Sequence, residues 1–278
     1  MDLKDLIKNR VEFTSLKKSG LESIYKYSRF DDKEYYKDLL NNVLYFPDIT
    51  QLNDPFDSQT PIRYDLCSDD ELNKIIVRSI PHYNPGNYND QLKRIFAKND
   101  FHIDPQKMYD RLTYFITRRV GIFSMAERKD NLLLWAHYTQ NHTGFCLEFD
   151  AQRLYDLLMG VFFKQNVKAF IYKVIYHKDY PILIPSVHNS EERLQKQFLI
   201  KSKEWEYEQE WRILVLDGIR KNEIPAGIIK NIYFGLNVKQ DNIETCAEIL
   251  KISNPGIGLY KAVKKKDAFG LDFKEIRI

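Results

Sequence analysis

The sequence has few cysteines and no long apolar segment, and both absences limit what the protein can be. Its three cysteines, Cys67, Cys146 and Cys246, lie far apart among 278 residues and include no C-x-x-C pair. An odd, sparse set of this kind argues against a disulfide framework or a zinc knuckle and favours buried thiols in a reducing compartment. No window approaches the roughly 20 apolar residues of a membrane span, and the N-terminal segment shows no apolar run of signal-peptide length. We therefore expect a cytoplasmic protein with no membrane partner.

The sequence also lacks the motifs of several common enzyme classes. It contains no G-x-x-x-x-G-K-[ST], no G-x-G-x-x-G, no G-x-S-x-G and no H-E-x-x-H. Its six histidines show no zinc-ligand spacing. These absences disfavour a P-loop enzyme, a Rossmann dehydrogenase, an α/β-hydrolase and a zinc protease. We predict no bound metal.

Charge of one sign is not concentrated anywhere in the chain. The 42 lysines and arginines nearly balance the 39 aspartates and glutamates, which gives a net charge of +3. No basic arm or acidic tail is present, so a nucleic-acid partner is neither demanded nor excluded. The sequence is rich in apolar residues, however, at 44% hydrophobic and 14% aromatic. A chain of this composition can bury a substantial core.

The apolar patterns predict strands and helices that do not alternate regularly, which is typical of an α+β fold with a mixed or antiparallel central sheet and flanking helices. We expect one domain over residues 1–278, with a mostly helical segment near residues 61–118 that is a possible insert. Asp31 and Asp150 are predicted helix N-caps, and Ser68-x-x-Glu71 is a capping box. The expected strands are 25–27, 44–46, 120–125, 144–149, 167–176, 204–216, 228–234, 258–263 and 271–276. The expected helices outside the insert are 31–42, 131–138, 150–158, 190–202 and 241–250.

The most informative segment is 204–216, which reads EWEYEQEWRILVL. If it forms one strand, its side chains alternate between two faces. One face is aromatic and apolar and suits a core. The other face presents Glu204, Glu206, Glu208, Glu210 and Arg212. Such a face is either solvated, with Arg212 bridging two carboxylates, or it tunes the pKa of one glutamate for work on a hydroxyl or a cation.

Three other short segments place polar residues in patterns that suit a site. The segment N-D-P-F-D at 53–57 is either a simple turn or a rigid support from which its two aspartates project. Trp135 and Tyr138 share one face of a short helix and His137 points elsewhere. The tryptophan is therefore a core candidate, and the histidine is more often structural than catalytic. Residues 141–144 are predicted to form the turn that ends this helix.

Together these segments resemble a bacterial family of unknown function, the domain-of-unknown-function family 2971. The resemblance extends from about Tyr25 to Ile276 and rests on the order of YKY, LYF, NDPFD, WAHY, NHxGxCxxFD and WxYExExR along the chain. The family has no assigned activity. Its members look like stand-alone cytoplasmic proteins and are thought of alongside phage-defence and toxin-like genes, so the resemblance implies such a context.

A second resemblance concerns chemistry. ADP-ribosyltransferases carry an E-x-E motif on a sheet strand and an N-terminal strand that holds NAD, and the glutamates here are similar in pattern. The resemblance implies that NAD, a small-molecule nucleotide, is the substrate, and that Glu208 or Glu210 stabilises the cation formed as nicotinamide leaves. The glutamate two residues earlier, Glu206 or Glu208, would orient an acceptor of unknown identity. The residues implied to contact NAD are Tyr27, Arg29, Asn53, Asp54, Asp57, Trp135, His137, Tyr138 and Arg212.

Two alternatives stay open at the level of the sequence. A metal-dependent nuclease or phosphodiesterase would use Mg²⁺ bound by hard carboxylate oxygens. The candidate ligands are Asp54, Asp57, Glu206, Glu208 and Glu210. A non-catalytic sensor or interaction module would need these residues only for its structure. Stabilisation by NAD alone favours the transferase, stabilisation by metal favours the nuclease, and neither is expected for the module.

Overall fold

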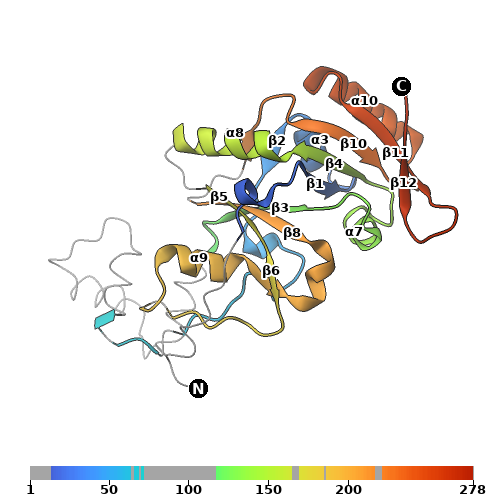
Figure 1. Ribbon diagram of the computed structural model, residues 1–278. Coiled ribbons are helices and arrows are strands. Elements are labelled where there is room, and N and C mark those ends of the chain that lie inside the picture. The colour runs from blue at the N-terminus through green and yellow to red at the C-terminus, as the bar shows by residue number, and fades with distance from the viewer. Residues whose placement is uncertain are drawn as a thin grey trace, which may run out of the picture.

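The protein has an α+β fold, as the sequence predicts, in which one large sheet carries helices on both faces (Figure 1). The computed structural model describes residues 14–63, 66–68, 70–71, 117–164, 169–184, 186–216 and 221–277. Most of the segment for which the sequence predicts helices, 61–118, lies outside the described residues. Its predicted capping box is present, since Ser68 N donates to the Glu71 carboxylate and Glu71 N donates to Ser68 Oγ.

The strands form one eight-stranded sheet and two small two-stranded sheets. Their bounds are β1 Ser23–Ser28, β2 Val43–Tyr45, β3 Gly121–Ala126, β4 Phe145–Asp150, β5 Ala169–Lys173, β6 Ile175–His177, β7 Ile200–Ser202, β8 Glu210–Val215, β9 Lys221–Glu223, β10 Ile229–Phe234, β11 Gly258–Lys264 and β12 Leu271–Glu275. The large sheet has the order β12-β11-β10-β4-β1-β3-β8-β5. All neighbours in it are antiparallel except β10 and β11, so the sheet is mixed.

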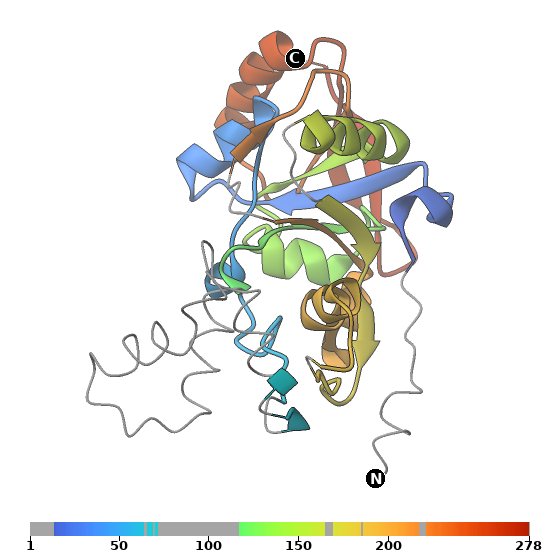
Figure 2. The same cartoon turned by 90° about the vertical axis from the view of Figure 1, so that its left-hand side faces the viewer.

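The helices of the described residues are α2 Leu16–Ser19, α3 Lys33–Leu40, α7 Leu132–Tyr138, α8 Ala151–Lys164, α9 Ser190–Phe198 and α10 Gln240–Ser253, with short 3-10 helices η1 Ile49–Gln51 and η4 Lys203–Glu208. Of these, α3, α8 and α10 cover one face of the large sheet, where the main core lies (Figures 1 and 2). Leu40 of α3, Leu154 of α8 and Leu250 of α10 pack in one buried cluster with Phe149 and Ile213 of the strands. Apolar burial of this extent supplies the main driving force for the fold.

The opposite face of the sheet is covered by α7, α9 and the 3-10 helices (Figures 1 and 2). Trp135 of α7 packs edge-on against Tyr27 of β1, with the ring centroids 5.3 Å apart. Since Trp211 and Ile213 of β8 join the main core, the alternating residues Glu210 and Arg212 point to this second face. Glu148 of β4 does the same. The second face therefore combines apolar packing with buried charge.

The predicted strand over 204–216 is wrong in its first half. Residues Lys203–Glu208 form η4, Gln209 has a left-handed backbone with φ 46°, and only β8 is a strand. The predicted face of evenly spaced glutamates therefore does not exist. The first two glutamates are exposed, whereas Glu208 and Glu210 are buried. Glu208 and Glu210 pair with Lys201 and Arg212, which come together only in the folded chain. These interactions of buried charges are large compared with the local preference of the segment for a strand.

The two predicted N-caps have different outcomes. Asp32, not Asp31, caps α3, since its side chain accepts a hydrogen bond from Tyr35 N at 2.9 Å. Positions 31 and 32 are both aspartate, so the sequence alone does not show which of them is the N-cap. The predicted cap of α8 is confirmed, because the Asp150 carboxylate accepts from Arg153 N at 2.9 Å. Such a bond satisfies one of the free backbone donors of the first helical turn.

Two other predicted elements are divided in the structure. The predicted strand 167–176 is two strands: β5 pairs with β8, after which Val174 N donates to Glu210 O and β6 pairs with β7. The predicted helix 190–202 ends at Phe198, and the following residues form β7. In both places the chain changes its pairing partner, which periodicity alone does not reveal. The remaining predicted elements outside 61–118 are present with shifted ends.

Candidate functional site

The candidate site is built around Arg212, which is fully buried on the second face of the sheet. Its guanidinium donates to both carboxylate oxygens of Asp57 and to both of Glu210. It also donates to Ser58 Oγ at 3.1 Å and to the carbonyl oxygen of Phe198 at 2.7 Å. A planar guanidinium that holds two carboxylates in this way fixes their orientation. The turn at 53–57 and the strand β8 are thereby joined.

Lys201 of β7 is the second buried cation of this cluster. Its ammonium lies 2.6 Å from Glu208, 3.1 Å from Glu210 and 3.5 Å from Asp57. It also lies over the Trp205 ring, 4.9 Å from the centroid. Lys201 therefore links η4 to the ion pairs below it. We call Asp57, Lys201, Glu208, Glu210 and Arg212 the buried charge cluster.

The buried charge cluster holds three carboxylates and two cations. Burial and the neighbouring Glu210 carboxylate raise the pKa of Glu208 above its ordinary value, although Lys201 acts in the opposite direction. Burial also acts to raise the pKa of Glu210, but Arg212 and Lys201 outweigh it and hold that pKa below its ordinary value. Two cations fully compensate only two carboxylates, and Glu208 is the third.

A polar contact connects the buried charge cluster to the protein surface. Tyr138 of α7 donates a hydrogen bond to Glu208 Oε1 at 2.5 Å and accepts one from Asn53 Nδ2 at 3.1 Å. Asn53 is exposed and Tyr138 is partly buried, so exposure increases from Arg212 through Glu208 to Asn53. Burial and the Glu208 carboxylate raise the pKa of Tyr138, which keeps its proton. Glu208 is therefore the carboxylate of the cluster that contacts the partly buried Tyr138.

The helix α7 and the 3-10 helix η4 are docked against each other by side chains that bracket the site. Asn131 caps α7 and also donates to Tyr207 O at 2.5 Å. His137 Nδ1 lies 3.1 Å from the Tyr207 hydroxyl, and Tyr138 bonds to Glu208. These contacts position Tyr138 over the carboxylate.

Residues 134–213 match the family model of DUF2971, described as a protein of unknown function. The matched part begins inside α7 and ends in β8, so it contains Tyr138, Lys201, Glu208, Glu210 and Arg212. It does not contain the turn at 53–57. Neither the curated proteins nor the solved structures include a match to the chain.

Tyr27 and Trp135 lie away from the buried charge cluster, in the apolar packing beneath α7. The Tyr27 hydroxyl donates to Arg128 O at 2.7 Å, and Trp135 Nε1 donates to Lys129 O at 2.7 Å. Trp135 is 0% exposed and also stacks on His142, with centroids 6.0 Å apart. The core role expected of the tryptophan is confirmed. Both side chains tether the loop after β3.

Four other candidate residues also lie outside the buried charge cluster. Arg29 is exposed and pairs with Asp31 at 2.9 Å. Asp54 is buried, and its carboxylate accepts from Phe56 N at 2.9 Å, so it stabilises the turn. His137 and Glu206 are exposed. The structure therefore brings together Asn53, Asp57, Tyr138, Glu208, Glu210 and Arg212 from the predicted set.

Sequence reasoning missed Lys201 and Tyr176. The expected helix 190–202 includes Lys201, whereas in the structure this residue lies on β7. The Tyr176 hydroxyl accepts from Glu210 N at 2.8 Å, and burial with Glu210 raises its pKa. Lysines and tyrosines occur near acidic residues in most sequences, so neither residue type is a signal by itself. The need of buried glutamates for a nearby cation is the one argument that would have suggested Lys201.

Metal and membrane interactions receive no positive indication from the described part of the chain. Within it, no group of three or more histidine, cysteine, aspartate or glutamate side chains is arranged to hold a metal ion. Of the five carboxylates proposed as Mg²⁺ ligands, Asp57, Glu208 and Glu210 are instead paired with Lys201 and Arg212. Asp54 bonds to a backbone N–H of its own turn, and Glu206 is exposed. None of the helices in the described ranges combines the length and apolar character needed to cross a membrane.

Proposed function

We propose that the protein consumes NAD by chemistry of the ADP-ribosyl-transfer type, with Glu208 as the reacting carboxylate. One observation carries this proposal: the buried charge cluster has two cations for three carboxylates, and the third carboxylate, Glu208, is also bound by the Tyr138 hydroxyl. The pKa of Glu208 is raised and that of Glu210 is lowered, which supports a role in which one carboxyl group exchanges a proton while the other stays ionised. The hydrogen bond to Tyr138 places Glu208 at the surface side of the pair.

The proposed reaction breaks the bond between the nicotinamide nitrogen and ribose C1′. Both electrons of that bond leave with nicotinamide, which departs neutral, and positive charge develops on the ribose. The ionised form of Glu208 stabilises this charge, as a fixed carboxylate does for a developing cation. An acceptor hydroxyl or water then bonds to C1′, and its proton passes to Glu208. With water the products are ADP-ribose, nicotinamide and a proton.

The other members of the buried charge cluster act as positioning residues in this proposal. Arg212 and Lys201 hold Glu210, and Lys201 holds one oxygen of Glu208. Because Glu208 is only 4% exposed, NAD reaches it only when the Tyr138 side chain turns away. Asn53 then lines the entrance. An effector of defence or toxin type, as the family resemblance implies, is consistent with an enzyme that depletes NAD.

The test is nicotinamide release from NAD by the wild type, Glu208→Gln and Glu206→Gln. Loss of a charged group that stabilises the transition state costs a factor of about 100 to 1,000 in rate. We expect that loss in Glu208→Gln and wild-type activity in Glu206→Gln, because Glu206 is exposed on the same 3-10 helix. Glutamine at 208 leaves two carboxylates with two cations, so the melting temperature should not fall.

Two results would contradict the proposal. Equal rates for Glu208→Gln and the wild type would remove Glu208 from the chemistry. Failure of the wild type to release nicotinamide, both in buffer and with a cell lysate as the source of acceptors, would remove the activity itself.

A further inference from the structure

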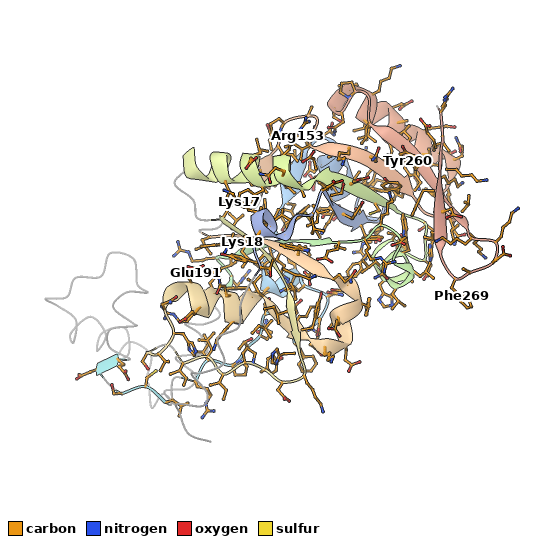
Figure 3. All side chains as sticks on the ribbon, viewed as in Figure 1. Lys17, Lys18, Arg153, Glu191, Tyr260 and Phe269 are labelled. Carbon is orange, nitrogen blue, oxygen red and sulfur yellow. The ribbon has the colours of Figure 1, made fainter. Side chains whose placement is uncertain are left out.

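A concave site lies on the same face of the sheet as the buried charge cluster, at the β10–β12 side, and none of its residues belongs to that cluster. Its volume is about 510 Å³, which lies within the range of small-molecule sites. Tyr260, labelled in Figure 3, lies on β11 among the side chains of these strands. The lining residues that matter here are Tyr25, Lys129, Tyr233, Tyr260 and Phe273.

The strand register assembles this pocket. Tyr25 of β1 is paired with Glu148 of β4, which is paired with Asn231 of β10, and Tyr233 is paired with Tyr260 of β11. Residues two apart on a strand point to the same face, so these side chains gather over neighbouring strands. The Tyr233 and Tyr260 rings stack with centroids 5.2 Å apart, and Phe273 meets Tyr233 edge-on at 4.9 Å.

A glycine makes room for the pocket side chains. A Cβ added at Gly258 would lie 2.3 Å from Asn231 Oδ1 and 2.8 Å from the ring of Tyr260. Both distances are too short for any other residue type without displacing those side chains. The conformations of Asn231 and Tyr260 therefore depend on the absence of a side chain at position 258.

A buried carboxylate, Glu148, supports the side chains that line the pocket. Glu148 accepts from Ser23 Oγ at 2.5 Å, Asn231 Nδ2 at 2.8 Å and Tyr233 Oη at 2.5 Å. Burial acts to raise its pKa, but these hydrogen bonds outweigh burial and hold the pKa below the ordinary value. Glu148 is thus a fixed negative group that orients the Tyr233 ring.

Lys129 is the cation in this pocket that is available to an anion. Its ammonium donates to the Tyr233 hydroxyl at 2.9 Å and lies 4.4 Å from the centre of that ring. Among the described residues, no carboxylate lies within ion-pair distance of it, and its charge helps to lower the pKa of the buried Glu148. The other charged pairs of the lining are satisfied, since Arg128 binds Asp130 at 2.9 Å and Glu127 binds Lys173 at 2.6 Å.

We infer that this pocket binds a mononucleotide-like ligand, which has a planar aromatic ring system and an anionic group. The aromatic system packs on the partly exposed rings of Tyr25 and Tyr260, which bind flat π-systems by stacking, whereas Tyr233 is only 3% exposed. The anionic group meets the Lys129 ammonium, which binds anionic oxygens through charge-assisted hydrogen bonds. The backbone of this lysine is held by the Trp135 indole, which fixes the position of the loop.

The test is calorimetric titration of the full chain with AMP, and with adenosine and inorganic phosphate as partial probes. We expect AMP to bind more tightly than either partial probe. Loss of a hydrogen bond to a charged group weakens binding about ten- to a hundredfold, and we expect this for Lys129→Met. Tyr260→Leu should weaken both AMP and adenosine. Lys251→Met is the matched control, because Lys251 is exposed on α10 across the sheet, and it should bind like the wild type.

Glu208→Gln separates this inference from the proposed NAD chemistry, because AMP binding should not change in that variant. Absence of AMP binding to the wild type at millimolar concentrations would overturn the inference. Binding that Lys129→Met and Tyr260→Leu leave unchanged would place the ligand elsewhere and overturn it too. Thermal melts of each variant show that a weakened variant is still folded.

Discussion

Replacement of Arg212 by methionine tests whether the buried charge cluster holds the fold together. The guanidinium makes six hydrogen bonds, two each to Asp57 and Glu210 and one each to Ser58 and Phe198. Methionine fills similar space but leaves two carboxylates buried without their main cation. The expected effect is a loss of unfolding free energy caused by uncompensated charge and not by a cavity.

The magnitude follows from the geometry. Removal of one partner of a buried ion pair costs about 3 to 5 kcal/mol. Lys201 stays 3.1 Å from Glu210 and 3.5 Å from Asp57, so we expect a value near the lower limit. Lysine at 212 keeps the charge but loses the planar fork, and Arg212→Lys should fall between the wild type and Arg212→Met. Arg153→Met is the control, since this arginine is 71% exposed and lies 3.9 Å from Asp150. Its cost should stay below about 1 kcal/mol.

The pH dependence identifies the cause. In the wild type the folded pKa of Glu210 is depressed, so its contribution to stability is present above the ordinary glutamate pKa of about 4.3 and is lost as pH falls below it. In Arg212→Met the carboxylates left without a cation are protonated more easily than in the wild type. The difference in unfolding free energy between the two proteins should therefore shrink as the pH falls from about 7 to about 5. The change should be about 1.4 kcal/mol for each unit by which the substitution raises a carboxylate pKa.

Urea unfolding followed by tryptophan fluorescence measures these differences. A cost of Arg212→Met below about 1 kcal/mol would refute the reasoning, because it would mean that the carboxylates find water or another cation. A cost that is the same at both pH values would also refute it, since lost packing does not titrate.

Two further predictions concern structural residues and use the same unfolding measurement. Trp135→Ala should lower the free energy of unfolding by about 3 to 5 kcal/mol, because the indole is 0% exposed. His137→Ala, on the same helix, should lower it by less than about 1 kcal/mol, because His137 is exposed. Equal losses in the two variants would contradict the packing of α7. Gly258→Ala should destabilise by about 1 to 3 kcal/mol, because the new Cβ would lie 2.3 Å from Asn231 Oδ1. In Gly160→Ala of α8 the new Cβ meets no atom within 4 Å, so this variant should be more stable than the wild type by about 0.5 to 1 kcal/mol. If Gly258→Ala and Gly160→Ala changed the stability in the same direction, the space around each glycine would not be what determines the effect.

The candidate site was found in part because its residue types are unusual where they occur. Carboxylates beside tryptophans, as in the segment with Glu208 and Glu210, indicate charge close to a core. Sequence did not reveal that the chain turns at Gln209, because the alternation of the segment fits a strand along its whole length. The pairing of Arg212 with Asp57, 155 residues away, is a long-range contact that no local pattern encodes. Glu148 is an acidic residue in the middle of the otherwise apolar strand β4, and it was a usable signal for the pocket at the β10–β12 side.

Apolar periodicity and capping residues act over a few positions, so they are enough to predict the α+β class, most of the strands and helices, and the core role of Trp135. Which charges are buried together cannot be predicted from such local patterns. That outcome depends on the meeting of β7, β8, η4 and the turn at 53–57, which are separated along the chain. The cost of burying a charge is set by the partners within a few ångströms of it, and partners distant in sequence are fixed only when the chain is folded.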